Sequence, residues 1–400
     1  MKSVLLECCF AAGLLAMTAV PLSAQAPTVS HQRATAFDLE QTGQIVEAET
    51  AWRSVLKVHP SDAEAYAHLG LLEARQEHYS AAVPLYRKAL ELNPAFRSLR
   101  LNLGLSLFKS GAMKEAIETF TPLLRSAAPS SPDAVRLDTL IWMAHYGLKE
   151  YAAAVPYLKK VTAADPQNLP YRLVLTQSCM WSAQYQCVLD TYHEIVELNA
   201  ESAEADMLAG EALDQMQNTQ GAIEQFRAAV KADPKAPNVH FGLGYLLWTQ
   251  DQYDEAAKEF QAELENFPEN AGALAFLADV DIHLGKQEDA LPLAEKAVQV
   301  DPGIAKAHVD LGILYAARDR QDDAVKEFKT AIKLAPSDQD PHWRLARLYQ
   351  TMGRQEEAKA EFEKTKTLHQ AEQQSIFSQL KAAQDRGAPA APQNSTPAEK

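Results

Sequence analysis

The stretch PNVHFGLGYLLWTQDQYDEAAKEFQAELENFPEN, residues 237–270, decides the fold, because its pattern returns in AKAHVDLGILYAARDRQDDAVKEFKTAIKLAPSD, residues 305–338. Both stretches contain 34 residues. Their apolar side chains are spaced by three and four, as on one face of a helix. A proline at position 32 follows the second of two such segments, because proline cannot continue a helix. The pattern predicts a hairpin of two amphipathic helices.

The same period covers most of the chain. Pro234, Pro268, Pro302 and Pro336 are each 34 residues apart, and aligning on them gives ten repeats. One insert, 131–134, separates repeats one to three (29–130) from repeats four to ten (135–372). The repeats are Val29–Asp62, Ala63–Phe96, Arg97–Ser130, Val135–Asn168, Leu169–Ser202, Ala203–Ala236, Pro237–Asn270, Ala271–Ile304, Ala305–Asp338 and Gln339–Glu372.

Three positions within the repeat predict how its two helices pack. Position 20 is alanine in nine of ten repeats, and position 24 is aromatic in eight. Position 8 is glycine in five repeats and alanine in three. Small residues at positions 8 and 20 allow the helices to approach closely, and the ring at position 24 is expected to fill the space against the next repeat.

Repeats four and five depart from this pattern. Trp142 and Thr176 replace the small residue at position 8. A tryptophan there is expected to push the helix pair apart or to turn outward. The insert before repeat four is expected to form an extended turn or to lengthen the first helix of that repeat.

These recurring residues resemble the tetratricopeptide repeat family over residues 29–372. The tryptophan of the family pattern is missing at position 4, where four repeats have Tyr66, His240, His308 and His342. The resemblance implies an all-α fold, a right-handed α-solenoid of tandem helix-turn-helix repeats. It also implies that the first helix of each repeat lines a concave groove that binds peptides or protein segments.

By the same resemblance, positions 2, 5, 9, 12 and 13 of each repeat face the groove. For the aromatic residues Trp181, Tyr245 and Trp248 we favour a role in binding, since exposed aromatic patches usually mark binding surfaces. The alternative is that groove side chains pack on neighbouring first helices. The predicted groove residues are Leu105, Phe108, Met143, Tyr146, Met180, Trp181, Glu211, Asp214, Phe241, Tyr245, Trp248 and Trp343.

Charge on these groove positions is uneven. Arg33, Arg75, Lys109 and Arg136 fall on the first four repeats. Repeats six and eight have Glu204, Glu211, Asp214 and Asp279, with no basic residue among the groove positions of those repeats. Two interpretations stay open, namely ordinary solvated charge and a polarised groove that orients a ligand with basic residues.

Composition restricts the function classes. Apolar residues make up 47% of the 400 residues and charged residues 23%, as in a folded protein. The formal net charge of −15 argues against nucleic acid as a partner, because nucleic-acid binding needs an excess of Lys and Arg. We find no catalytic motif and no metal-ligand spacing among the histidines, so the sequence predicts no enzyme, cofactor or metal site.

The N-terminus has the features of a secretory signal peptide over residues 1–26. Lys2 precedes an apolar stretch, and Ala24-Gln25-Ala26 offers a cleavage site, after Ala26 or after Ala24. The alternative is retention by an uncleaved N-terminal segment. Cleavage predicts an exported protein, periplasmic or secreted, with no membrane span in the mature chain.

Two cysteines remain after this cleavage, Cys179 and Cys187, on either side of the turn in repeat five. Position 11 is expected to face inward and position 19 outward, so the pair is either a disulfide across the turn or two small apolar side chains. Beyond the repeats, residues 373–386 are expected to form a capping helix and residues 387–400 a disordered tail.

Together these features predict an exported adaptor or scaffold that binds protein or peptide segments without catalysis. The first alternative is a structural spacer or a self-associating component of an envelope assembly. A carbohydrate-binding solenoid is the second. The sequence leaves the identity of the partner and the oligomeric state open.

Overall fold

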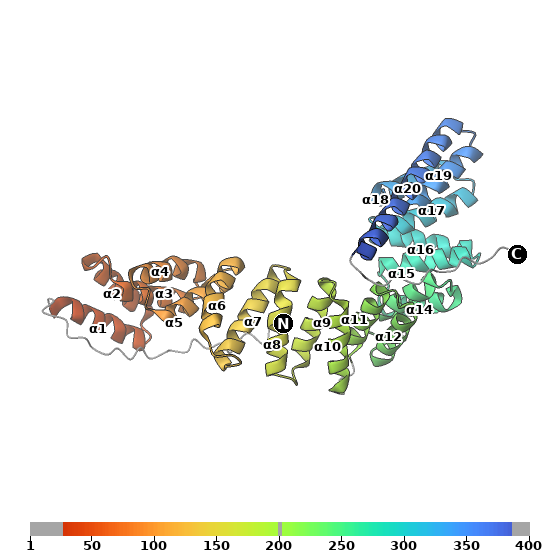
Figure 1. The fold of residues 1–400 in the computed structure, drawn as a ribbon. Helices are drawn as coiled ribbons and strands as arrows, with labels where there is room; N and C mark the ends of the chain where they lie inside the picture. Colours follow the sequence, from red (N-terminus) through yellow and green to blue (C-terminus); the bar gives the residue numbers. More distant parts are fainter. Residues whose placement is uncertain (1–26, 199–201, 386–400) are drawn as a thin grey trace. The chain divides into compact units, whose positions relative to one another are not determined.

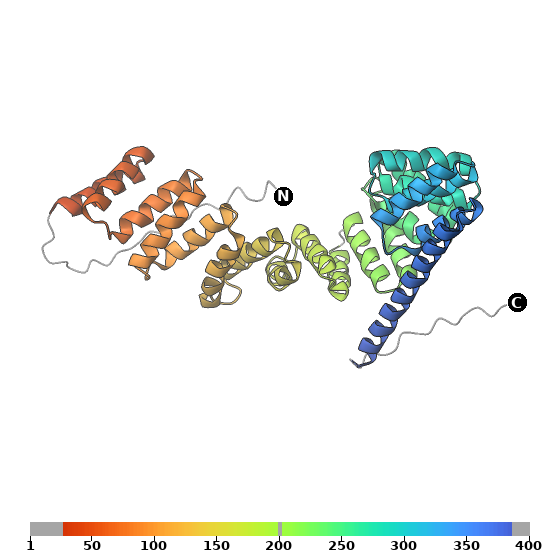
Figure 2. The ribbon, with the colours of Figure 1, turned by 90° about the horizontal axis from the view of Figure 1, so that it is seen from above.

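A computed structural model describes residues 27–198 and 202–385, and these two ranges form two compact halves. Every regular element in these residues is an α-helix, and consecutive helices form antiparallel pairs within each half (Figures 1 and 2). The chain is therefore an α-solenoid of tandem helix pairs, as the sequence predicts. The predicted signal peptide and tail lie outside the described residues.

The N-terminal half contains repeats one to five. The first helices are α1 (Pro27–Gln41), α3 (Ala63–Arg75), α5 (Arg97–Lys109), α7 (Pro132–Gly147) and α9 (Leu169–Trp181). The second helices are α2 (Ile45–Val58), α4 (Tyr79–Leu92), α6 (Met113–Ser126), α8 (Tyr151–Ala164) and α10 (Tyr185–Glu197).

The C-terminal half contains repeats six to ten. The first helices are α11 (Ala203–Gln215), α13 (Val239–Thr249), α15 (Ala271–His283), α17 (Ala305–Ala317) and α19 (Gln339–Thr351). The second helices are α12 (Thr219–Ala232), α14 (Tyr253–Asn266), α16 (Gln287–Val300), α18 (Gln321–Leu334) and α20 (Gln355–Asp385).

Glycine at position 8 and an aromatic ring at position 24 explain the close packing within a repeat. A Cβ atom added at Gly104 would lie 2.4 Å from the Phe120 ring, which is fully buried. The ring also reaches the next repeat, because a Cβ atom at Gly242 would lie 2.1 Å from Phe226 of the preceding repeat. The ring thus fills the space on both sides, and at Gly104 and Gly242 it lies where a Cβ atom would stand.

In repeat four the large residue stands at position 8 and the smaller one at position 24. Trp142 at position 8 is buried, with 5% of its surface exposed, and position 24 is Leu158, which is also buried. The expectation that Trp142 turns outward was wrong. A large residue is accommodated at position 8 where the aromatic ring at position 24 is absent, which conserves volume in the core.

The insert before repeat four lengthens a helix. α7 has 16 residues, against 13 in α3, α5 and α9. It begins after Ser131, whose hydroxyl oxygen accepts a hydrogen bond from the Ala134 backbone N–H at 3.2 Å. Of the two expectations for this insert, the longer first helix is the one observed.

The segment expected to form a capping helix continues α20 without a break. α20 has 31 residues, and its C-terminal part is drawn in dark blue in Figure 2. Residues 373–385 are therefore the C-terminal part of the second helix of repeat ten, and residue 386 lies outside the described part.

The first helices form a layer of their own in the C-terminal half. α11, α13, α15, α17 and α19 each contact the next helix of that series. Each second helix packs mainly on the first helix of its own repeat and on that of the following one. Because the elements on the inner side of a curved array lie closest together, the first helices form the inner surface of this half.

Candidate binding surface

Two groups of aromatic side chains lie at the first helices, one in each half, and the N-terminal group also includes Tyr151 at the start of the second helix α8. We call Tyr146, Tyr151 and Trp181 the N-terminal aromatic cluster. The C-terminal aromatic cluster consists of Phe241, Tyr245, Trp248 and Phe276. Tyr151 and Phe276 were missed in the sequence, because they stand outside the positions assigned to the groove.

The N-terminal aromatic cluster presents one exposed ring on two supporting rings. Trp181, the last residue of α9, is 50% exposed. Its ring centroid lies 4.5 Å from that of Tyr151 and 5.9 Å from that of Tyr146. The Tyr146 hydroxyl donates a hydrogen bond of 2.6 Å to Oε1 of Gln177, which holds the supporting ring in place. Trp181 is thus an accessible apolar contact with a defined orientation.

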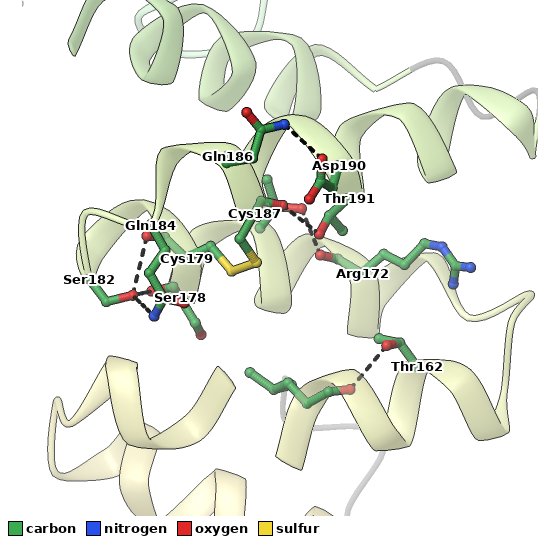
Figure 3. The surroundings of a disulfide bond; sticks show 12 residues. Thr162, Arg172, Ser178, Cys179, Ser182, Gln184, Gln186, Cys187, Asp190 and Thr191 are labelled. Carbon is green, nitrogen blue, oxygen red and sulfur yellow. Dashed lines mark hydrogen bonds between the residues drawn. A yellow bond between two sulfur atoms is a disulfide. The ribbon is translucent and has the colours of Figure 1, made fainter. Parts of the chain in front are cut away.

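A disulfide closes the turn that follows Trp181. Cys179 in α9 and Cys187 in α10 are bonded, with their Cα atoms 5.8 Å apart (Figure 3). Of the two alternatives left open by the sequence, the disulfide is the one in the structure. The outward direction expected for Cys187 was wrong, since only 8% of the residue is exposed. The bond ties α9 to α10 next to the exposed ring.

The C-terminal aromatic cluster is more deeply packed. Tyr245 is its exposed member, at 38%, and its ring meets Phe276 edge-on at 5.4 Å. Phe241 and Trp248 are half-buried and contact the same Phe276 ring. Tyr245 therefore corresponds to Trp181 in the N-terminal cluster, as the ring that a ligand can reach.

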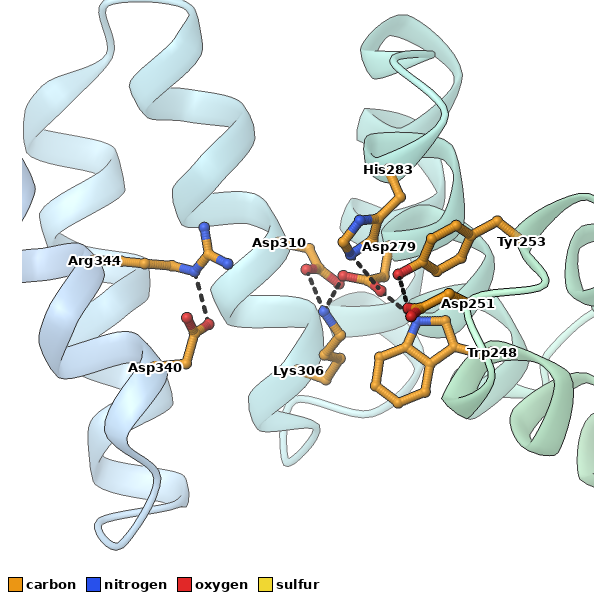
Figure 4. A network of polar contacts seen from close by, with 9 residues as sticks. All are labelled: Trp248, Asp251, Tyr253, Asp279, His283, Lys306, Asp310, Asp340 and Arg344. Atoms are coloured by element: carbon orange, nitrogen blue, oxygen red, sulfur yellow. Dashed lines mark hydrogen bonds and ion pairs between the residues drawn. The ribbon is translucent and has the colours of Figure 1, made fainter. Parts of the chain in front are cut away.

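Trp248 differs from the accessible ring that the sequence predicts. Its Nε1 donates a hydrogen bond of 2.6 Å to Oδ2 of Asp279 in the next first helix. Asp279 also forms an ion pair with Lys306 of α17, and Lys306 contacts Asp310 at 2.8 Å (Figure 4). Trp248 is thus part of a polar network joining three consecutive first helices.

This network contains a buried carboxylate in an unusual state. Asp310 is fully buried, and its Oδ2 has no hydrogen-bond partner among the described residues. Burial raises the pKa of Asp310 to about 7, although Lys306 opposes the shift. Burial alone would lower the pKa of Lys306, but the charges of Asp310 and Asp279 raise it. Lys306 therefore stays protonated and neutralises its neighbours.

Charge on the first-helix surface differs from the sequence expectation. Arg33 bonds Asp62 at 2.6 Å, and Arg75 pairs with Glu40 at 3.4 Å, so these cations are already neutralised. Asp279 of repeat eight is paired as well, because Lys306 of repeat nine binds it. The N-terminal repeats therefore do not supply the positive end of a polarised groove through these two arginines.

Glu211 and Asp214 of α11 do remain without partners. Within residues 202–385 neither forms an ion pair or a side-chain hydrogen bond. Desolvation raises the pKa of the Glu211 carboxyl, although the residue reaches solvent. A carboxylate in this state gains from a cation that a ligand brings.

The remaining predicted groove residues divide into packed and exposed ones. Leu105 and Phe108 are half-buried against the core of the N-terminal half, and Met143 and Met180 are half-buried as well. Trp343 of α19 is 43% exposed, and the Arg347 guanidinium lies over its ring, with Cζ at 5.3 Å from the centroid.

The histidines at position 4 have a structural role. His240, His308 and His342 each place Nδ1 2.6 Å from a glutamate of the second helix of the same repeat. These pairs join the two helices where the family pattern has tryptophan. No group of side chains suited to a metal ion occurs in residues 27–198 or 202–385. Across the same residues, no helix is long and apolar enough to cross a membrane.

Comparisons with known proteins agree with this architecture. Family models described as tetratricopeptide repeat match residues 35–95, 69–132, 101–168, 189–237, 207–271, 241–303, 277–341 and 340–368. The matches leave out residues 169–188, which contain α9 with Trp181 and the disulfide.

Two curated relatives are similar over most of the chain. Protein CTR9 homolog of Arabidopsis thaliana is 25% identical over 69% of this chain and 26% of its own length. BBSome complex member BBS4 of Mus musculus is 24% identical over 65% of this chain and 56% of its own length. The chain thus spans about a quarter and about half of these two relatives. The solved APC/C hetero-tetramer Cut9-Hcn1 gives a TM-score of 0.43 at 13% identity, covering 86% of this chain and 88% of that one.

Proposed function

Because the chain belongs to the tetratricopeptide repeat family, whose members generally mediate protein–protein interactions, we propose that it is a non-catalytic adaptor or scaffold that binds protein segments on its first helices. The observation that carries the proposal is the pair of exposed aromatic rings, Trp181 and Tyr245, each held by neighbouring rings. Oriented aromatic side chains at a surface are typical of binding hot spots.

The ligand proposed for the C-terminal half has basic residues. Glu211 and Asp214 have no cation partner within that half, and Tyr245 stands on the next first helix. A Lys or Arg side chain would find a carboxylate and the face of an aromatic ring there. The name of the mouse relative, a member of the BBSome complex, is consistent with a role in an assembly.

Affinity capture with matched variants tests this function. Trp181→Ala and Tyr245→Ala should each weaken binding of a partner about 30-fold, the effect of losing a hot spot of about 2 kcal/mol. The controls are Val196→Ala and Leu334→Ala, which remove exposed apolar groups from second helices of the same two halves. Equal loss with the controls would contradict the proposal. Recovery of the chain's own copies alone would favour the self-associating scaffold instead.

We also propose that the protein is exported through residues 1–26, on the sequence features of that segment. N-terminal sequencing of the protein from the periplasm or medium should find Gln25 or Pro27 first. An intact Met1 on protein in the cytoplasm would contradict export and leave the binding proposal untouched.

A further inference from the structure

The inner surface of the C-terminal half has free charges of opposite sign at its two ends. We propose that it selects an extended protein segment with a basic side chain at one end and an acidic side chain at the other. Arg347 and Trp343 receive the acidic side chain, and Glu211 and Asp214 receive the basic one. This inference rests on the proposed function and adds the charge pattern and orientation of the ligand.

The positive end lies on α19. Arg347 is exposed and has no carboxylate within ion-pair distance among residues 202–385. Its guanidinium lies over the exposed Trp343 ring, with Cζ 5.3 Å from the ring centroid. A guanidinium without a carboxylate partner offers two parallel N–H donors to a carboxylate that a ligand brings. The nearby Arg344 differs, because Asp340 already binds it at 2.7 Å.

The negative end lies on α11, and the repeat register connects it to the aromatic cluster. Side chains at position 12 of one repeat contact position 9 of the next, as in Tyr146 with Gln177 and Trp248 with Asp279. The same register places Asp214, at position 12, beside the exposed Tyr245, at position 9 of the next repeat. A bound ammonium or guanidinium would therefore meet carboxylate and ring together.

In the middle of the surface the charges of Asp279, Lys306 and Asp310 are paired with one another. Asp279 and Asp310 are buried and bound to Lys306, so this network is closed within the protein (Figure 4). Tyr245 and Phe276 supply apolar contact on the α11 side of the network. A ligand that gains most from this surface is thus apolar in its centre and charged at its ends.

The helix series sets the length of the segment. Packed helices lie about 8–10 Å apart, so the four steps from α11 to α19 span roughly 35 Å along the inner surface. An extended chain advances about 3.3 Å per residue, so the two charged side chains should be about 10–12 residues apart.

Selection from a library of random 16-residue peptides tests the charge pattern. The peptides are displayed on phage with their C-termini fused to the coat protein, so only side chains supply carboxylates. Wild-type protein should enrich peptides with Lys or Arg near one end and Asp or Glu about 10–12 residues away. Arg347→Glu should lose the acidic preference and keep the basic one. Enrichment of basic residues alone by the wild type would overturn the inference while supporting the proposed function. Absence of any enrichment over an unrelated protein would contradict both.

Binding of one enriched peptide then tests the pairing directly. Arg347→Glu should weaken binding about fivefold or more at low salt, and replacing the acidic residue of the peptide by Lys should restore it. Lys296→Glu makes the same charge change on the exposed side of α16 and should leave binding within about twofold. Equal weakening by the two variants would show that net charge acts instead of a contact at Arg347, and would overturn the inference.

Discussion

Replacing Trp248 by Phe should loosen the C-terminal half, because the indole N–H holds a buried carboxylate. Nε1 of Trp248 donates a hydrogen bond of 2.6 Å to Asp279. Asp279 is only 3% exposed and also binds Lys306. Phenylalanine keeps most of the apolar ring and removes this donor together with a smaller part of the ring surface. The change thus tests mainly the contribution of one charge-assisted hydrogen bond between α13 and α15.

The size of the effect follows from this contact. A hydrogen bond to a charged group contributes about 1.5–3 kcal/mol, and the smaller ring buries less apolar area, which costs up to about 1 kcal/mol. Because Lys306 still satisfies Asp279 in part, we expect a total loss of about 2–3 kcal/mol. The opening equilibrium of these helices should rise about 30-fold or more, at tenfold for each 1.4 kcal/mol.

Hydrogen exchange followed by mass spectrometry measures this opening for the peptides of α13 and α15. The control is Trp181→Phe. This half-exposed indole packs on Tyr151 and makes no hydrogen bond among the described residues, so the exchange of α9 should change by about twofold or less. Equal acceleration by the two variants would refute the assignment of Trp248 to the structural network. No acceleration by Trp248→Phe would show that the bond to Asp279 does not stabilise the half.

Three further predictions concern packing, pH and the disulfide. Gly104→Ala should lower the free energy of unfolding by about 1–2 kcal/mol, because overpacking against Phe120 exceeds the gain in helix propensity. Gly147→Ala, where a Cβ atom has room, should raise the free energy of unfolding by about 0.5 kcal/mol. Urea titration of the two variants distinguishes these signs. The pKa of Asp310 is raised from 3.8 to about 7 in the folded state, so the folded state holds this proton more tightly than the unfolded state does. The stability of the C-terminal half should therefore fall as pH rises from about 4 to about 7. Hydrogen exchange measured at several pH values should show this fall in the wild type and a flatter profile in Asp310→Asn. Replacing both Cys179 and Cys187 by Ala should destabilise α9 and α10 by about 2–3 kcal/mol, and a dithiol reductant should produce the same acceleration of exchange in the wild type but none in the variant.

Much of the fold could be predicted because the repeat carries it in short-range pattern. Proline at position 32 and the small residues at positions 8 and 20 set the ends and the approach of each helix pair, and these need no knowledge of distant contacts. Trp142 shows the limit of this reasoning. Trp142 can be buried because Leu158, 16 residues away, is smaller than the aromatic ring that usually stands at position 24. A prediction that considers position 8 alone does not detect this compensation in side-chain volume.

The binding surface could be predicted only in part, since it depends on contacts between repeats. Trp181 and Tyr245 are exposed where the groove positions place them. Trp248 occupies an equivalent position, yet Asp279 of the following repeat draws it into a polar network. Phe276 contacts the Tyr245 and Trp248 rings, although it stands at a position that was not assigned to the groove. Tyr146 and Gln177, like Trp248 and Asp279, are hydrogen-bond partners 31 residues apart on consecutive first helices. Such pairs depend on how the two helices are aligned, and the residue types alone do not reveal that alignment.

The central claim is that the first helices, and not the second ones, hold the partner. Hydroxyl-radical footprinting of the full chain, alone and bound to its captured partner or enriched peptide, measures this at single side chains. We predict that Trp181 or Tyr245, or both, lose most of their oxidation on binding, while Val196 and Leu334 on the second helices keep theirs. Protection of Val196 and Leu334 with undiminished oxidation of Trp181 and Tyr245 would contradict the account.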